Sequence, residues 1–161
     1  MADKEGLRET LEAWRQGLPF LTWEKVSRGR PDRVAIALFG DEGEDSQEVR
    51  SLALHARTAG ARLERFADPL TPGAVPLFSH KPWEDWVAGG VDTVLLAGKL
   101  SFAGLIYGGL LGRVVALQKQ PLLRTILPLA QLNLSPSGLE LPCLQQLAKS
   151  GVEVIQGVEI P

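Results

Sequence analysis

A chain of 161 residues that is 45% apolar and 22% charged has the length and composition of one globular domain with a sizeable core. The net charge of −2 argues against nucleic acid or an anionic membrane as partner, and the single cysteine, Cys143, excludes a disulfide framework and a thiolate metal cluster. The charged start, "MADKEGLRETLEAW", and the lack of an apolar run of about 20 residues predict a cytoplasmic protein with no membrane partner.

The first segment is predicted to be an amphipathic helix from Asp3 to Leu18. Apolar side chains recur along it at spacings of four, three and four residues, which places them on one helical face. They are Leu7, Leu11, Trp14 and Leu18. "GLPF" ends the helix, and "SRGRPD", from Ser27 to Asp32, is typical of an exposed connection. We therefore expect an N-terminal helix and linker in residues 1–31 and an α/β domain in residues 32–161.

The second region alternates short apolar runs with helical patterns and has no hairpin signal. Strands are expected at 33–39, 61–67, 74–79, 91–98, 121–128 and 152–155, and helices at 44–59, 80–90, 100–120 and 142–151. "GRVVALQ" is also rich in β-branched residues, but the surrounding pattern favours a helix for Arg113 to Lys119. The order predicts an α/β fold, a Rossmann-like open parallel sheet of about six strands with helices on both faces.

Four loops are candidates for a ligand site, because ligands of open parallel sheets bind outside the carboxyl ends of the strands. They span residues 40–45, 79–80, 98–103 and 128–138. The first loop contains four carboxylates, which oppose a bound phosphate: Asp41, Glu42, Glu44 and Asp45. These carboxylates either cap the next helix and complement its dipole, which we favour, or hold a divalent cation. We assign no metal site.

The second loop carries the most interesting titratable side chain, His80. It follows an apolar run and is either an acid/base group near neutral pH or a loop histidine bonded to Asp85 or Glu84. The nearby Trp83 and Trp86 either stack on a planar ligand or anchor the loop. Standard signatures such as GxxxxGK[ST], GxSxG, HExxH and CxxC are absent from the sequence.

Three stretches are similar to the motifs of a known family. They are "SHKPWEDWVAGGVDTVLLAGKLSFAG", "QKQPLLRTILPLAQLN" and "LPCLQQLAKSGVEVIQG". Together with the order of elements from Arg33 onward, they resemble the flavoproteins typified by phosphopantothenoylcysteine decarboxylase and the lantibiotic cysteine decarboxylases. The resemblance implies a Rossmann-like fold that binds FMN and forms trimers, or multiples of trimers, with the flavin near a subunit interface. It also implies that His80 is a catalytic acid/base and that Ser101, Phe102 and Asn133 contact the cofactor.

The sequence departs from the family pattern at several of these positions. The small Gly/Ser turn that takes the FMN phosphate in the family is replaced by the longer acidic loop. The family's "S-A-N-T" asparagine has no counterpart, because Phe102, Ala103 and Gly104 stand there, and Leu132 replaces the methionine before Asn133. These departures argue against FMN binding.

A divergent branch of such flavoprotein-like chains accompanies bacterial microcompartments for propanediol or ethanolamine utilisation. These chains begin with a short amphipathic helix, and residues 3–18 resemble that arrangement. The resemblance implies docking of the helix on a microcompartment shell or cargo protein. The alternative is a helix folded back on its own domain.

The resemblance therefore implies two alternative functions. The first is an accessory or structural protein of a microcompartment, a homo-oligomer with a degenerate flavin site. The second is an FMN-dependent oxidoreductase or decarboxylase-like enzyme. The replaced loop residues favour the first, and the retained His80 and Asn133 favour the second.

Overall fold

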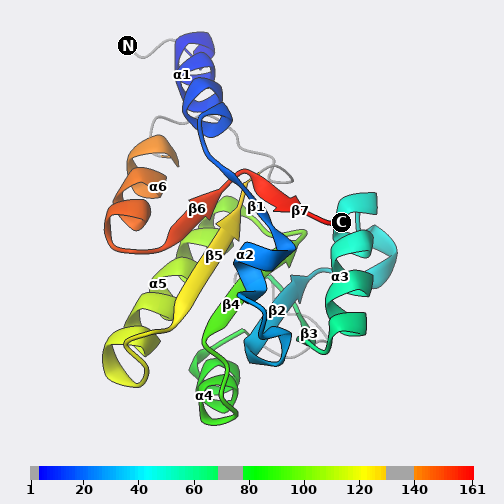
Figure 1. The fold of residues 1–161 in the computed structure, drawn as a ribbon. Coiled ribbons are helices and arrows are strands. Elements are labelled where there is room, and N and C mark those ends of the chain that lie inside the picture. Colours follow the sequence, from blue (N-terminus) through cyan, green and yellow to red (C-terminus); the bar gives the residue numbers. More distant parts are fainter. Residues whose placement is uncertain (1–3, 69–77, 130–139) are drawn as a thin grey trace.

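A computed structural model describes residues 4–68, 78–129 and 140–161 of the chain (Figure 1). The elements are, in order, α1 (Lys4–Gln16), β1 (Phe20–Thr22), α2 (Trp23–Ser27), β2 (Val34–Phe39), α3 (Gln47–Ala59), β3 (Arg62–Phe66), α4 (His80–Ala88), β4 (Thr93–Gly98), α5 (Phe102–Gln118), β5 (Arg124–Pro128), α6 (Glu140–Lys149), β6 (Glu153–Ile155) and β7 (Gly157–Glu159). Short 3₁₀ turns, η1 (Pro31–Arg33) and η2 (Glu42–Glu44), flank β2.

The main sheet has five parallel strands in the order β3-β2-β4-β5-β6. This confirms the predicted open parallel α/β fold, with five strands in the part of the chain described, where about six were expected. The predicted strand at 74–79 lies outside the described residues up to residue 77, and Phe78 and Ser79 are not in a strand. Numbered by their order in the chain, the five strands lie side by side in the sheet as second, first, third, fourth and fifth. The chain passes from β2 to β3 in one direction across the sheet and continues to β4 on the other side of β2, so a switch point lies between β2 and β4.

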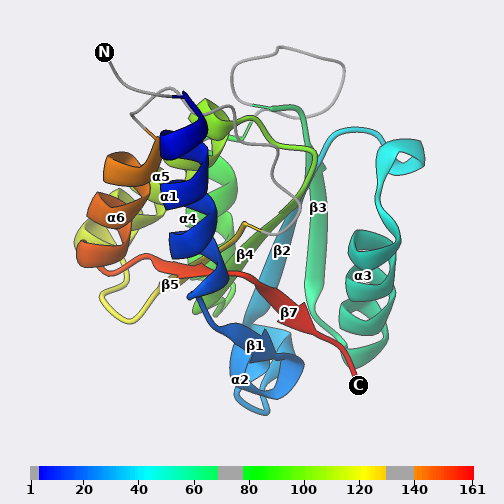
Figure 2. The same ribbon diagram turned by 90° about the horizontal axis from the view of Figure 1, so that it is seen from above.

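Two clusters of buried side chains cover the two faces of this sheet. Figure 2 shows α4, α5 and α6 on one side of the strands and α3 on the other. The first cluster joins the α4, α5 and α6 side chains to Leu11 of α1, and the second joins α3 to Trp23 and Val26 of α2. Both faces are apolar because β2, with the sequence VAIALF, is buried at every position. Among the described residues, no helix is long and apolar enough to cross a membrane.

The predicted helix at Arg113 to Lys119 is confirmed, because α5 runs to Gln118 and Lys119 follows as its C-cap. Glycines let this helix approach the sheet closely. A Cβ atom on Gly108 would lie 2.5 Å from Leu96 Cδ2, and one on Gly112 would clash with Thr125 Oγ1. The glycine face of α5 therefore lies against β4 and β5, where a larger side chain would push the helix away.

Residues 20–27 are more ordered than the sequence suggested. Residues 20–22 form β1, which pairs in parallel with β7, and α2 buries Trp23, Val26 and Ser27. The exposed connection predicted from Ser27 to Asp32 is therefore wrong at Ser27, although Arg28 to Arg30 are exposed. The signal was hard to read because a strand of three residues and a helix of five are too short for a clear hydrophobic period.

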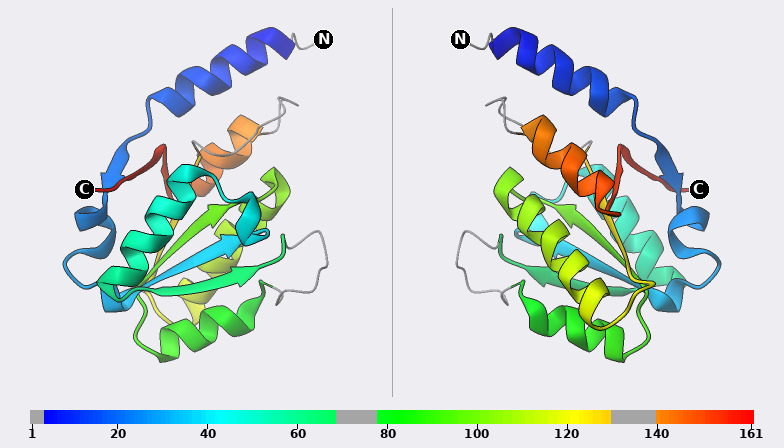
Figure 3. Two further views of the ribbon diagram at one scale, coloured as in Figure 1. Left: turned by 90° about the vertical axis from the view of Figure 1, so that its right-hand side faces the viewer. Right: turned by 90° about the vertical axis from the view of Figure 1, so that its left-hand side faces the viewer.

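Helix α1 also packs on its own domain. Leu11 is only 3% exposed, and Trp14 and Leu18 are half-buried against the same cluster. Figure 3 shows α1 running along the side of the molecule that carries α6. The side-chain amide of Gln156, just before β7, donates to the carbonyls of Gln16 (3.2 Å) and Leu18 (3.1 Å) at the end of the helix. Of the two arrangements considered for the N-terminal helix, the structure shows the one in which the helix packs on its own domain.

Arg124 ties α2 to the sheet. Its guanidinium donates to both carboxylate oxygens of Glu153, at 2.7 and 3.0 Å, and to the backbone carbonyls of Val26 (3.0 Å) and Lys25 (3.4 Å). The arginine side chain is 13% exposed, so these bonds are largely shielded from solvent. One side chain thus joins β5, β6 and the carboxyl end of α2.

We expect Arg124→Ala to lower the free energy of unfolding by about 2 kcal/mol, because it leaves the α2 carbonyls and Glu153 without their donor. Urea denaturation measures the change. Lys81→Ala is the matched control, since the Lys81–Asp85 pair is exposed and its loss should cost roughly 0.5 kcal/mol or less. Equal effects of the two substitutions would contradict this role of Arg124.

Candidate functional site

The carboxyl ends of β2 and β4 meet at the switch point of the sheet, where Phe39 lies opposite Gly98. Gly98 has a φ of +95°, and a Cβ atom there would lie 2.6 Å from the carbonyl oxygen of Phe39. Glycine is therefore required for the two strands to end this close together. Two loops leave from this point, 40–45 after β2 and 99–101 after β4, and they form the expected ligand edge.

The acidic loop is held by cations of the same chain. Lys99 Nζ lies 2.7 Å from Glu44 Oε2, across the switch point. Arg65 of β3 donates to both carboxylate oxygens of Asp45, at 3.2 and 2.8 Å, and to the carbonyl of Gly40 at 2.8 Å. Ser46 Oγ caps α3 by accepting from the amide of Val49 at 3.3 Å.

The ion pair across the switch point shifts the acid–base behaviour of both partners. The hydrogen bond from Lys99 lowers the pKa of Glu44, and the backbone N–H of Asp41 and the charge of Lys99 act in the same direction. The same hydrogen bond and charge raise the pKa of Lys99. The stability that Glu44 contributes is therefore present above its unfolded-state pKa and is lost as the pH falls through its lowered pKa.

A second carboxylate lies at the start of α5. Asp68, which follows β3, accepts a hydrogen bond from the backbone N–H of Ser101 at 2.6 Å. Ser101 is the N-cap of α5, and its Oγ accepts from the backbone N–H of Gly104 at 3.0 Å. The N-terminus of a helix is the usual place for a ligand phosphate in such folds. Here a side chain of the protein supplies the anion.

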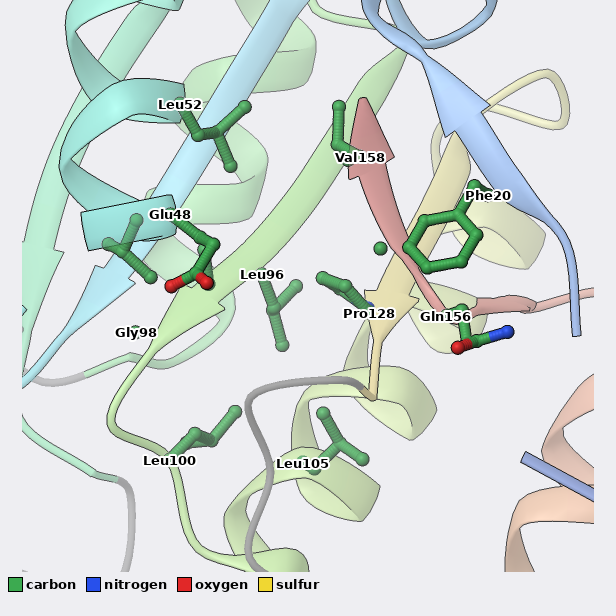
Figure 4. Close-up of a pocket in the computed structure, with 13 residues that line it drawn as sticks. Phe20, Glu48, Leu52, Leu96, Gly98, Leu100, Leu105, Pro128, Gln156 and Val158 are labelled. Atoms are coloured by element: carbon green, nitrogen blue, oxygen red, sulfur yellow. The ribbon is translucent and has the colours of Figure 1, made fainter. Parts of the chain in front are cut away.

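A small cavity of about 120 Å³ lies beyond the carboxyl ends of β4 and β5 (Figure 4). Its wall is mainly apolar and comes from α3, β4, α5 and the β1–β7 pair; it includes Leu52, Leu96, Leu100, Leu105, Val158 and Phe20. Glu48 and Gln156 add polar groups on opposite sides of it. Pockets for drug-sized ligands and cofactors usually measure about 300–1,000 Å³, so this cavity is small for a cofactor.

The structure places the predicted site residues as follows. Ser101 lies at the switch point, and Phe102 is half-buried beside it against the core. His80 is exposed at the first position of α4, and Asp85, considered as its partner, pairs with Lys81 at 3.3 Å. Asn133 lies outside the described residues.

The tryptophans that follow His80 belong to the core. Trp83 and Trp86 are fully buried and pack with Phe39, Phe66 and Phe78 in one aromatic cluster. The indole N–H of Trp86 donates to Glu64 at 3.0 Å. The two tryptophans therefore anchor α4 in the core and do not form a stacking surface for a planar ligand.

Sequence reasoning missed two charged residues at this edge, Asp68 and Lys99. Lys99 lay in a loop already considered a ligand loop, but its partner Glu44 is 55 positions away in the chain. Asp68 directly follows the end of β3 in the "RFAD" stretch, so the rule that polar residues at carboxyl strand ends form sites would have found it. In the described ranges, no three His, Cys, Asp or Glu side chains come together as a metal site would require.

No family model matches this chain, and no curated protein matches it.

We expect Lys99→Met to raise the pKa of Glu44 toward its ordinary value, because the main hydrogen bond and the charge that lower it both come from Lys99. Carboxyl ¹³C NMR during an acid titration measures this value. Lys81→Met removes an exposed lysine elsewhere and should leave Glu44 unchanged. A Glu44 that titrates identically in all three proteins would show that the pair is not formed in solution.

Proposed function

We propose that this chain is a non-catalytic, flavoprotein-like accessory protein of a bacterial microcompartment, with a flavin site closed by its own side chains. The observation that carries the proposal is the carboxylate of Asp68, which accepts a hydrogen bond from the amide of Ser101, the N-cap of α5, at 2.6 Å. A phosphate bound there would face that carboxylate at close range, and like charges at such a distance repel.

The described residues fit FMN poorly at the other expected position as well. The loop after β2 presents Glu44 and Asp45 paired with Lys99 and Arg65, where a phosphate would need free backbone N–H groups and unpaired cations. The neighbouring cavity of about 120 Å³ is too small for a cofactor of several rings. Binding of FMN would therefore require these ion pairs to break and the edge to open.

The microcompartment setting rests on the resemblance of residues 3–18 to the terminal helices of such proteins. In the structure the apolar face of α1 is turned to its own domain, with Leu11 buried. Docking through that face would require α1 to leave the domain, and it would expose Leu11, Trp14 and Leu18. Docking through the outer face of α1, where Arg8 and Glu9 are exposed, requires no such release.

An FMN-dependent oxidoreductase or decarboxylase-like enzyme is the second candidate. The strand order favours it, because flavodoxin-like sheets with this order bind FMN at the same switch point. In that function His80 would act as an acid/base and Ser101, Phe102 and Asn133 would contact the cofactor. His80 is exposed, so a substrate could reach it.

The two functions are separated by purifying the protein and recording its visible spectrum before and after addition of FMN. The closed switch point predicts a colourless preparation that leaves the fluorescence of added FMN unchanged. Asp68→Ala is the matched variant, because it frees the Ser101 amide and removes one negative charge, and far-UV circular dichroism verifies that it is folded. A yellow wild-type protein, or wild type that quenches FMN fluorescence at micromolar concentration, would overturn the proposal.

A further inference from the structure

Helix α5 is apolar on two opposite faces. The inner face carries the glycines that lie against the sheet, together with the buried Leu111 and Val115. On the outer face large apolar side chains recur at spacings of three, four and three residues: Tyr107 (40% exposed), Leu110 (53%), Val114 (37%) and Leu117 (76%). We call these four residues the α5 stripe. A helix that is hydrophobic all round is normally buried, and the outer half of α5 is not.

The neighbouring helices leave the α5 stripe uncovered. Helix α5 contacts both α4 and α6, and its inner face packs against β5. The exposures of the stripe residues show that these contacts stop short of the outer face. Leu122, in the turn that follows α5, is 77% exposed and adds a fifth large apolar side chain at the same end of the helix as Leu117.

The α5 stripe carries no charge. Between Phe102 and Gln118 the one charged residue is Arg113, and its guanidinium lies against Gly151 at the end of α6. The outer surface of α3 is different, because Glu48, Arg50 and Arg57 are exposed there. An uncharged face cannot form ion pairs with a charged partner. It can be buried against an identical face without leaving any charge unpaired.

The size of the stripe fits a pair of copies. Taking side-chain areas of roughly 150–200 Å² with the fractional exposures above, Leu122 included, gives on the order of 500 Å² of apolar surface per copy. Two copies would then bury roughly 1,000 Å², which is the lower limit for a specific interface. A two-fold axis brings the same stripe from both copies together and closes the assembly at two.

We propose that the α5 stripe is the contact surface between two copies of this chain. This contact depends only on the exposure, spacing and charge of α5 residues, and it is independent of the flavin site and of the microcompartment setting. It also differs from the trimer implied by the family resemblance, because a two-fold contact of identical stripes joins two chains.

Sedimentation velocity and light scattering of the full chain over a range of concentrations test the proposal. Wild type should be largely dimeric at about 100 µM and should dissociate on dilution, since an interface near the lower size limit supports a weak dimer. Leu110→Glu should weaken the dimer by about 100-fold, because it places one charge from each copy in the interface, and Leu110→Glu with Leu117→Glu should be monomeric. Glutamate is a good helix former, so these exposed positions should keep α5 intact, which far-UV circular dichroism and the urea midpoint verify.

Leu54→Glu is the matched control. Leu54 is 67% exposed on α3, on the opposite side of the sheet, and its substitution should leave the dimer unchanged. A wild type that is monomeric at about 100 µM would overturn the proposal. A binding partner of the α5 stripe would then be a different protein. A dimer that survives both glutamates, or that Leu54→Glu dissociates, would overturn it too, because the contact would lie elsewhere.

Discussion

The parallel pairing of β1 with β7 is the contact on which the arrangement of the molecule depends. A five-stranded parallel sheet has two apolar faces to cover, and here α4, α5 and α6 all lie on one of them. On the other face α3 covers only part, and Ile126 and Ile155 of β5 and β6 share their cluster with α2. Because β1 is bound to β7, the segment of residues 20–27 is held beside the C-terminal strand, and α2 is placed on this face.

The pairing of β1 with β7 also affects the N-terminal helix and the ligand edge. Gln156 bonds to the end of α1, so the start of the chain is fixed to the segment before β7. Phe20 of β1 and Val158 of β7 also form part of the wall of the small cavity beyond β4 and β5. The terminal strands therefore occupy space beside the carboxyl edge, where an open sheet would leave room for a ligand. Together with Asp68, Glu44 and Lys99, they fill part of this edge as far as the described residues form it.

The sheet itself could be predicted from the sequence because its central strands are uninterrupted apolar runs. "VAIALF" and "TVLLAG" are long enough to stand out. The stretch "SFAGLIYGGLLGRVVALQ" is apolar all round, and its length, which exceeds that of a strand, indicates a helix. The β1 strand and α2 could not be predicted, since their stability comes from Arg124, Trp23 and β7 and not from a local pattern. Trp23, for example, packs edge-on against His55 of α3, 32 positions further along the chain.

The candidate site was predictable in its location but not in its chemistry. Strand ends indicated the loops at 40–45 and 98–103, and the structure places both at the switch point. Which charges meet there depends on the order of strands in the sheet, because Asp68 follows β3 and Glu44 lies in the loop after β2, while Ser101 and Lys99 follow β4. A single sequence does not determine that order. The retained asparagine of the family motif, Asn133, stays a prediction.

Hydrogen exchange of the two terminal segments tests the pairing of β1 with β7 most directly. Peptides covering residues 20–27 and 156–160 should exchange slowly, because β1 pairs with β7, the amide of Gln156 bonds to the carbonyl of Pro19, and α2 is packed on the core. A linker of the kind that the sequence suggested would exchange at the rate of an unprotected chain. Rapid exchange of residues 20–27 while β5 and β6 stay protected would contradict the account, since the second face of the sheet would then be covered in another way.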